Sequence, residues 1–162
     1  MKGRNVTIVD YGLGNLFSVK RAFEVCGVGT VNVTQDPKII ASSERLVLPG
    51  VGSFSDGMIG LRRNGLDQAV FEFASTRRPF QISSELRDMA RFLLPDCLTR
   101  SVYLIHSYQF IPDSAENILA TYRYGGADIT AAIYKDNIFG FQFHPEKSGK
   151  LGIEILSRFM ML

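Results

Sequence analysis

The chain has 162 residues, of which 46% are hydrophobic and 21% are charged, and its formal net charge is +2. This length suits one domain, and the balance is typical of a folded protein with a buried core. The charge is too small to indicate binding to nucleic acid or to an anionic membrane surface. No apolar run reaches the ~20 residues of a membrane-spanning helix, and the first residues lack the pattern of a secretory signal. We therefore expect a cytoplasmic protein that binds neither nucleic acid nor membrane.

The two cysteines, Cys26 and Cys97, stand far apart in the sequence. One such pair is no disulfide framework, and neither cysteine belongs to a Cys/His cluster with metal-ligand spacing. We expect both thiols to be reduced and partly buried, and we expect no metal site.

Segments with strand-like and helix-like spacing of apolar residues alternate in the first half of the chain. The predicted strands are residues 5–10, 31–34 and 45–48, and the predicted helices are 16–25, 56–63 and 65–75. This alternation indicates βαβ units and a parallel sheet, in which ligands bind beyond the carboxyl ends of the strands. The glycine-rich turns Y-G-L-G-N, residues 11–15, and P-G-V-G-S, residues 49–53, fall at two such ends.

The second half of the chain has a different order of elements. Its predicted strands are residues 101–106, 118–124, 128–134 and 138–143, and an amphipathic helix is predicted at 149–161. The short link at residues 135–137 indicates an antiparallel hairpin. Since no repeat or linker interrupts the sequence, one domain is predicted over residues 1–162.

The sharpest chemical signal is F-Q-F-H-P-E-K, residues 141–147, where an apolar strand ends at His-Pro-Glu. Proline stops the strand, which leaves His144 at its carboxyl end, beside the ligand-binding edge of the sheet. Glu146 can turn back and accept a hydrogen bond from one imidazole nitrogen, so the other nitrogen can take a proton from a thiol. A surface pair without function is the alternative for these two residues taken alone.

A second signal is L-P-G-V-G, residues 48–52, which ends a predicted strand. One interpretation is a strand-ending turn without further function. The other is an oxyanion hole, because glycines allow a peptide N–H to rotate toward a developing negative charge.

A third signal is His106-Ser107-Tyr108, at the end of another predicted strand. Taken alone it is a polar strand end. His106 could be considered as a base, but the chain has only 2 histidines and the H-P-E context favours His144. We therefore expect His106 to be structural.

Together these motifs resemble the class I glutamine amidotransferases, and within them the glutaminase subunit of imidazole glycerol phosphate synthase. The matching stretches are Y-G-L-G-N at 11–15, P-G-V-G-S-F-S-D-G-M at 49–58 and H-P-E-K-S at 144–148. The resemblance covers roughly residues 5–80 and 101–161. It implies a three-layer, flavodoxin-like α/β domain with a largely parallel central sheet and a C-terminal antiparallel hairpin region.

In that family the subunit hydrolyses glutamine to glutamate and ammonia, and the ammonia passes to a (β/α)8-barrel cyclase partner in histidine biosynthesis. No cofactor or metal takes part in this half of the reaction. Carried over to this sequence, the resemblance makes His144 and Glu146 the catalytic pair. The residues implied in the other roles are Gly50 and Val51 for the oxyanion peptide, Gly52, Ser107 and Tyr108 for bound glutamine, and Asn15 and Lys147 for the partner interface.

The sequence departs from this pattern after Arg78-Pro79-Phe80, where the family has a nucleophile elbow of the form G-x-C-x-G-M-Q. Here the chain continues Q-I-S-S-E-L, without the cysteine and its glycines, and residues 81–100 replace a much longer piece. A strained strand-to-helix turn normally projects the nucleophile at such an elbow. The domain is therefore predicted to be internally truncated and inactive as a glutaminase.

Other residues are poor substitutes for the missing cysteine. Ser84 lies where counting from R-P-F would put it, but a serine hydroxyl is a weaker nucleophile, and Glu85 beside it would repel an oxyanion. Ser84 also fits the N-cap of a helix over residues 85–94. Cys97 follows that helix and Cys26 precedes a helix-ending glycine, so core positions are expected for both.

Four interpretations of the whole chain remain open at this point. The chain is a glutaminase subunit by descent whose own hydrolysis has been lost, or it is a non-enzymatic module that docks on a synthase partner. Alternatively, it carries a natural or cloning deletion and has no function of its own. In the fourth interpretation, a similar subunit feeds ammonia to a sugar-modifying synthase.

Overall fold

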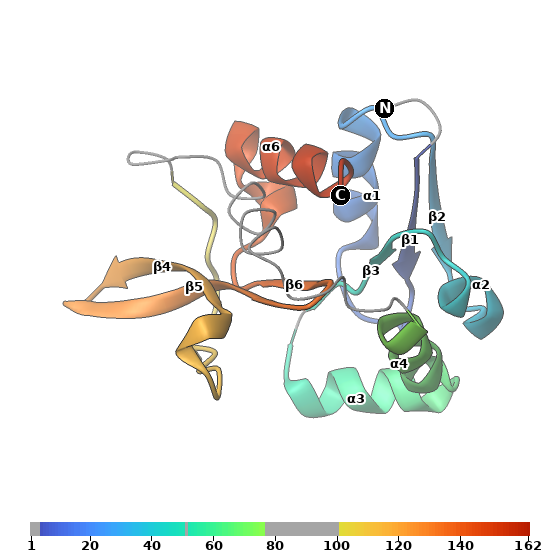
Figure 1. Ribbon diagram of the computed structural model, residues 1–162, viewed down its shortest axis with the longest axis horizontal. Coiled ribbons are helices and arrows are strands. Elements are labelled where there is room, and N and C mark those ends of the chain that lie inside the picture. The colour runs from blue at the N-terminus through green and yellow to red at the C-terminus, as the bar shows by residue number, and fades with distance from the viewer. Residues whose placement is uncertain (1–3, 51, 77–100) are drawn as a thin grey trace. The chain divides into compact units, whose positions relative to one another are not determined.

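The computed structural model describes residues 4–50, 52–76 and 101–162. The chain divides into two compact units, the first containing the described residues up to 76 and the second containing residues 101–160 (Figure 1). The single domain predicted from the sequence stays a prediction. The R-P-F segment, the predicted helix over 85–94 and the candidates Ser84 and Cys97 lie outside the described residues.

The first unit is built on a parallel sheet in the order β2-β1-β3. Its strands are β1 (Asn5–Val9), β2 (Thr30–Thr34) and β3 (Leu46–Val47). The β-branched side chains of the central strand β1 are fully buried at Val6, Ile8 and Val9, as expected for a parallel strand covered on both faces. The parallel sheet predicted from the alternation of elements is therefore confirmed.

Four helices accompany this sheet: α1 (Leu16–Val25), α2 (Pro37–Ala41), α3 (Phe54–Arg63) and α4 (Leu66–Thr76). The bounds of α1 are those predicted, and α3 and α4 begin and end within two residues of their predicted positions. The short helix α2 was not predicted. It begins where the Asp36 carboxylate accepts the Lys38 N–H at 2.8 Å and where Pro37 occupies the first helical position, which is a favourable start for a helix.

The second unit contains an antiparallel sheet in the order β4-β5-β6, followed by helix α6. The elements are β4 (Ile118–Tyr124), β5 (Ala127–Lys135), β6 (Ile138–Phe141) and α6 (Gly149–Phe159). Both hairpins turn through two residues. Gly125 and Gly126 both have left-handed backbone, whereas in the second turn it is Asp136 (φ 53°) that has it and Asn137 does not. The predicted antiparallel hairpin region is confirmed.

Residues 101–106 were predicted as a strand, and this prediction is wrong, because no strand is assigned there. The segment does alternate, with Val102, Leu104 and His106 half-buried and Tyr103 and Ile105 exposed. The backbone hydrogen bonds of this segment, however, do not form the ladder of a β-sheet. The Tyr103 N–H goes to the side chain of Ser148 at 3.0 Å and its carbonyl accepts the N–H of His144 at 3.0 Å.

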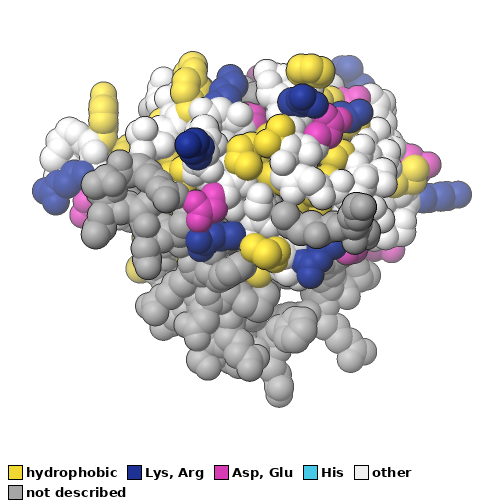
Figure 2. Space-filling model, turned by 90° about the horizontal axis from the view of Figure 1, so that it is seen from above, with side chains coloured by type: hydrophobic (Ala, Val, Ile, Leu, Met, Phe, Trp, Pro, Cys, Tyr) yellow, Lys and Arg dark blue, Asp and Glu magenta, His cyan; other side chains and the backbone are white. Residues whose placement is uncertain are grey.

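Charged groups of opposite sign are interspersed on the face of the molecule seen in Figure 2. Described Lys and Arg side chains there stand next to Asp, Glu and hydrophobic ones, without forming a continuous basic patch. None of the helices in the described ranges is long and apolar enough to cross a membrane.

The core of the first unit depends on a close approach between helix α3 and Tyr11. This core contains Val9, Tyr11, Ile40, Leu61, Leu66 and Ala69. A Cβ atom at Gly60 of α3 would lie 2.7 Å from the Tyr11 carbonyl oxygen and 3.0 Å from its ring carbon Cδ2. Only glycine therefore allows α3 to reach its position.

We predict that Gly60→Ala destabilises the protein by about 1–3 kcal/mol, because the added methyl must displace the Tyr11 backbone. Gly57, in the same helix, is the matched control, since a Cβ there would meet nothing within 4 Å. Gly57→Ala should leave stability unchanged or raise it by roughly 0.5–1 kcal/mol, the usual gain for Gly→Ala in a helix. Urea unfolding of both variants followed by circular dichroism measures this difference, and equal effects of the two substitutions would contradict it.

Candidate functional site

The H-P-E-K segment forms a tight turn between strand β6 and helix α6. His144 has an extended backbone (φ −95°, ψ 99°), and a 3-10 turn follows at Pro145–Lys147. The turn is closed by hydrogen bonds from the Lys147 N–H to the His144 carbonyl and from the Ser148 N–H to the Pro145 carbonyl, both 3.0 Å long. Proline suits the first position of such a turn because its φ is fixed and it has no N–H to satisfy.

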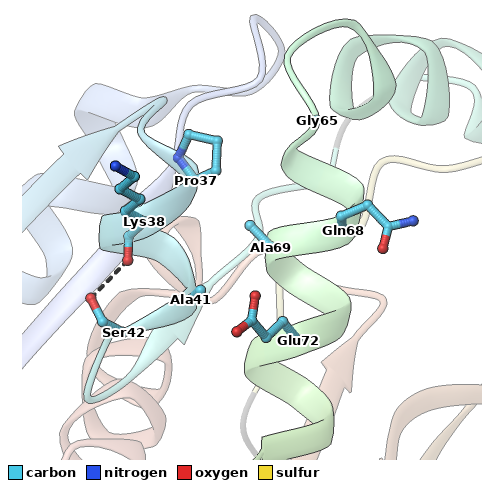
Figure 3. Close-up of a pocket in the computed structure, with 8 residues that line it drawn as sticks. All are labelled: Pro37, Lys38, Ala41, Ser42, Gly65, Gln68, Ala69 and Glu72. Atoms are coloured by element: carbon cyan, nitrogen blue, oxygen red, sulfur yellow. Dashed lines mark hydrogen bonds between the residues drawn. The ribbon is translucent and has the colours of Figure 1, made fainter.

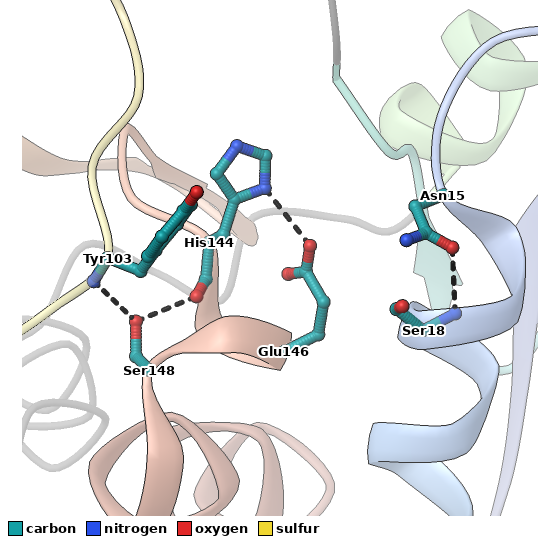
Figure 4. Close-up of polar contacts among 6 residues, drawn as sticks. All are labelled: Asn15, Ser18, Tyr103, His144, Glu146 and Ser148. Carbon is teal, nitrogen blue, oxygen red and sulfur yellow. Dashed lines mark hydrogen bonds and ion pairs between the residues drawn. The ribbon is translucent and has the colours of Figure 1, made fainter.

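Within this turn, His144 and Glu146 face one another (Figure 4). The imidazole Nδ1 lies 3.0 Å from Oε1 of Glu146, and the side chains are 23% and 9% exposed respectively. A carboxylate only accepts hydrogen bonds, so Nδ1 carries the proton. In the neutral imidazole, the other ring nitrogen, Nε2, is then an acceptor that can take a proton from a neighbouring nucleophile.

Ser148 holds the backbone of His144 in place. Its buried hydroxyl donates to the His144 carbonyl at 2.7 Å and accepts the Tyr103 N–H at 3.0 Å (Figure 4). Helix α6 also packs closely against the turn, because a Cβ at Gly152 would lie 1.8 Å from the Pro145 carbonyl oxygen. Sequence reasoning gave neither residue a role. Ser148 was noted only as the last residue of the matching stretch H-P-E-K-S, and Gly152 only as a position within the predicted C-terminal helix.

Lys147 lies on the exposed side of the same turn. Its ammonium is 5.2 Å from the centre of the Tyr103 ring, a cation–π distance. That ring also meets the His144 imidazole edge-on, with 6.1 Å between the ring centres. The predicted partner-interface residue and the predicted base therefore contact the same tyrosine.

The H-S-Y motif belongs to the same compact unit as His144. Ser107 is exposed, and Tyr108 is 88% exposed. His106 has no carboxylate partner in the described part of the chain; its Nδ1 lies 2.8 Å from the backbone carbonyl of Tyr108. Of the two histidines, His144 is thus the one oriented by a carboxylate.

The predicted oxyanion segment lies in the first unit and is anchored at Pro49. The Tyr11 hydroxyl donates to the Pro49 carbonyl, and a Cβ at Gly14 would lie 3.1 Å from the Pro49 side chain. Gly50 and Gly52 are exposed, and Gly52 has a left-handed backbone (φ 78°). Val51 lies outside the described residues, so the oxyanion role of the Gly50–Val51 peptide stays a prediction.

Asn15 also belongs to the first unit, where it begins helix α1. Its side-chain oxygen accepts the Ser18 N–H at 3.1 Å, which is a helix N-cap (Figure 4). The residue is exposed, and its amide nitrogen has no recorded partner among the described residues. The interface role implied for Asn15 is therefore compatible with its capping role.

Two other features of the described residues lie apart from these motifs. A shallow pocket between α2 and α4 is lined by Pro37, Lys38, Ala41, Ser42, Gly65, Gln68, Ala69 and Glu72 (Figure 3), none of which is a predicted site residue. Cys26 is buried, with 5% exposure, as expected for a core position. The ranges that the structure describes hold no group of three or more His, Cys, Asp or Glu residues that could bind a metal.

Comparison with known proteins gives the family. Residues 85–162 match the family model described as glutamine amidotransferase class-I. Imidazole glycerol phosphate synthase subunit HisH 1 of Legionella pneumophila strain Paris is 32% identical over 212 residues, covering 98% of this chain and 99% of the relative. The HisH subunit of Moorella thermoacetica is 33% identical over 199 residues (96% of this chain, 94% of the relative). That of Geobacter sulfurreducens is 33% identical over 204 residues (95% and 97%).

The length of the first alignment also bears on the predicted truncation. It spans 212 positions, whereas this chain has 162 residues, so at least 50 positions have no residue of this chain opposite them. These relatives are matched over 94–99% of their length, with gaps inside the alignment. This chain belongs to the class I glutamine amidotransferase family, in the branch of the HisH subunits.

Proposed function

We propose that this chain is a glutamine amidotransferase subunit of an imidazole glycerol phosphate synthase, which binds glutamine and docks on a cyclase partner without hydrolysing glutamine itself. The observation that carries the proposal is the 3.0 Å hydrogen bond between His144 and Glu146 within the H-P-E-K-S turn. The relatives named as HisH subunits support the choice of synthase. These relatives favour imidazole glycerol phosphate synthase over a sugar-modifying synthase as the assembly to which this subunit belongs.

Glutamine hydrolysis by this family needs a thiol as well as a base. A thiolate attacks the carboxamide carbon, the amide nitrogen leaves as ammonia, and water then releases glutamate from the thioester. Nε2 of His144 would take the thiol proton and return it to the leaving ammonia, while Glu146 stabilises the imidazolium. An N–H of the Gly50–Val51 peptide would stabilise the oxyanion.

What this sequence lacks is a thiol at the position of the family's nucleophile. Neither of its 2 cysteines stands in the elbow directly after R-P-F, and Cys26 is buried in the first unit. A base without a nucleophile lowers no barrier, because the covalent step cannot begin. This favours a subunit that retains binding and docking but delivers no ammonia.

We expect no glutamate release above background when the chain is incubated with glutamine, with or without the barrel partner. An enzyme-coupled glutamate assay measures this, and an intact HisH relative with the same partner is the positive control. Turnover that disappears in His144→Ala would contradict the prediction. Loss of that turnover in Ser84→Ala would identify a serine nucleophile, and loss in Cys97→Ala would identify a relocated thiol.

Docking on the partner is predicted to depend on Lys147. Removing an exposed cation at an interface commonly costs more than 1 kcal/mol when it lies in the energetic centre, so Lys147→Ala should weaken binding roughly five- to tenfold. Lys150→Ala is the matched control, because Lys150 is also exposed and lies three residues further along. Surface plasmon resonance against the immobilised cyclase subunit measures both. Equal affinities of the two variants would rule out the interface assigned to Lys147.

A further inference from the structure

His106 is a polar side chain whose two ring nitrogens have very different surroundings. Its Nδ1 lies 2.8 Å from the Tyr108 carbonyl oxygen, whereas its Nε2 is shielded from solvent and has no hydrogen-bond partner in the described residues. The ring also packs edge-on against Tyr122 of β4, with 6.5 Å between ring centres and an angle of 76°. A buried nitrogen without a partner is uncommon in folded proteins and calls for an explanation.

The alternation of residues 101–106 explains why this ring is directed inward. Val102, Leu104 and His106 are the half-buried members of that segment, and the first two pack on the core of the second unit. His106 is thus the last inward residue before the exposed pair Ser107-Tyr108. The alternation would place another apolar side chain at this position, and the chain has an imidazole there instead.

The hydrogen bond fixes which nitrogen carries the proton. A carbonyl oxygen only accepts, so Nδ1 of His106 must be the donor. A second N–H, at Nε2, would have no acceptor there, so the tautomer protonated at Nδ1 alone fits this site. The bond spans only two residues, and it therefore restrains the backbone of Ser107 and Tyr108 directly.

We propose that His106 is a positioning residue, which holds the Ser107-Tyr108 backbone in the conformation that receives glutamine. This inference rests on the proposed function, because that function includes glutamine binding. His106 cannot serve as the base in this arrangement, since Nε2, its nitrogen without a proton, is shielded from solvent. Its role is to keep two exposed residues ordered before any ligand arrives.

Two substitutions separate this role from simple packing. In His106→Asn the amide nitrogen can occupy the place of Nδ1 and keep the bond to Tyr108, whereas in His106→Gln it lies near the place of Nε2. We expect His106→Gln to weaken L-glutamine binding roughly three- to tenfold, the effect of losing one neutral hydrogen bond. Hydrogen–deuterium exchange at residues 107–110 should rise in the same variant. Both quantities should stay close to the wild-type values in His106→Asn.

Titration calorimetry with L-glutamine and exchange mass spectrometry on the full-length chain provide the two measurements. If the wild-type chain binds no glutamine, both the proposed function and this inference are wrong. If it binds glutamine and His106→Gln binds equally well, only this inference is wrong. Equal losses in the Asn and Gln variants would also overturn it, because they would indicate that ring packing alone matters.

Discussion

The Ser148 hydroxyl makes the contact on which the geometry around His144 depends. It accepts from the Tyr103 N–H and donates to the His144 carbonyl, while the His144 N–H returns to the Tyr103 carbonyl. These three bonds close a ring that joins two segments more than 40 residues apart in sequence. Removing the Ser148 hydroxyl would leave the Tyr103 N–H and the His144 carbonyl without these partners. The imidazole is held by its backbone before Glu146 orients its ring.

Several residues that carry a family signature also have a structural task in this chain. Asn15 caps α1, Tyr11 bonds to Pro49, and Ser148 links the H-P-E-K turn to Tyr103. Loss of function after substitution at such a position does not by itself distinguish contact with a ligand from support of the backbone. The pair His106→Asn and His106→Gln is informative for that reason, because one of the two substitutions keeps the hydrogen bond to Tyr108.

Elements defined by local signals were the ones that the sequence predicted well. Helix α1 begins at an Asn N-cap and ends before Gly27, and β4 has β-branched and aromatic residues before a Gly-Gly turn. Both have the predicted bounds. The failure at residues 101–106 has a tertiary cause, since the pattern of side chains is that of a strand while the bonding partner is a serine hydroxyl. No local signal specifies that partner.

The residues of the candidate site fall into the same two groups, those with a local signal in the sequence and those whose contacts depend on the folded chain. His144 and Glu146 are two residues apart, so their hydrogen bond could be anticipated from the H-P-E spacing alone. The roles of Ser148 and Gly152 were not predicted. Ser148 bonds to Tyr103 and Gly152 packs against Pro145, and only the folded chain brings these residues together. The roles of Gly50, Gly52, Ser107 and Tyr108 depend on a bound substrate, and they stay predictions.

The contacts of Tyr11 have a consequence for engineering of the glycine-rich segment. Its carbonyl leaves no space for a side chain at Gly60, its hydroxyl bonds to Pro49, and Pro49 in turn crowds Gly14. Four positions from three separate stretches of the chain are thus mutually dependent. A loop transplanted from another protein in place of residues 49–53 would keep its shape only if compatible residues at positions 11, 14 and 60 were transferred with it.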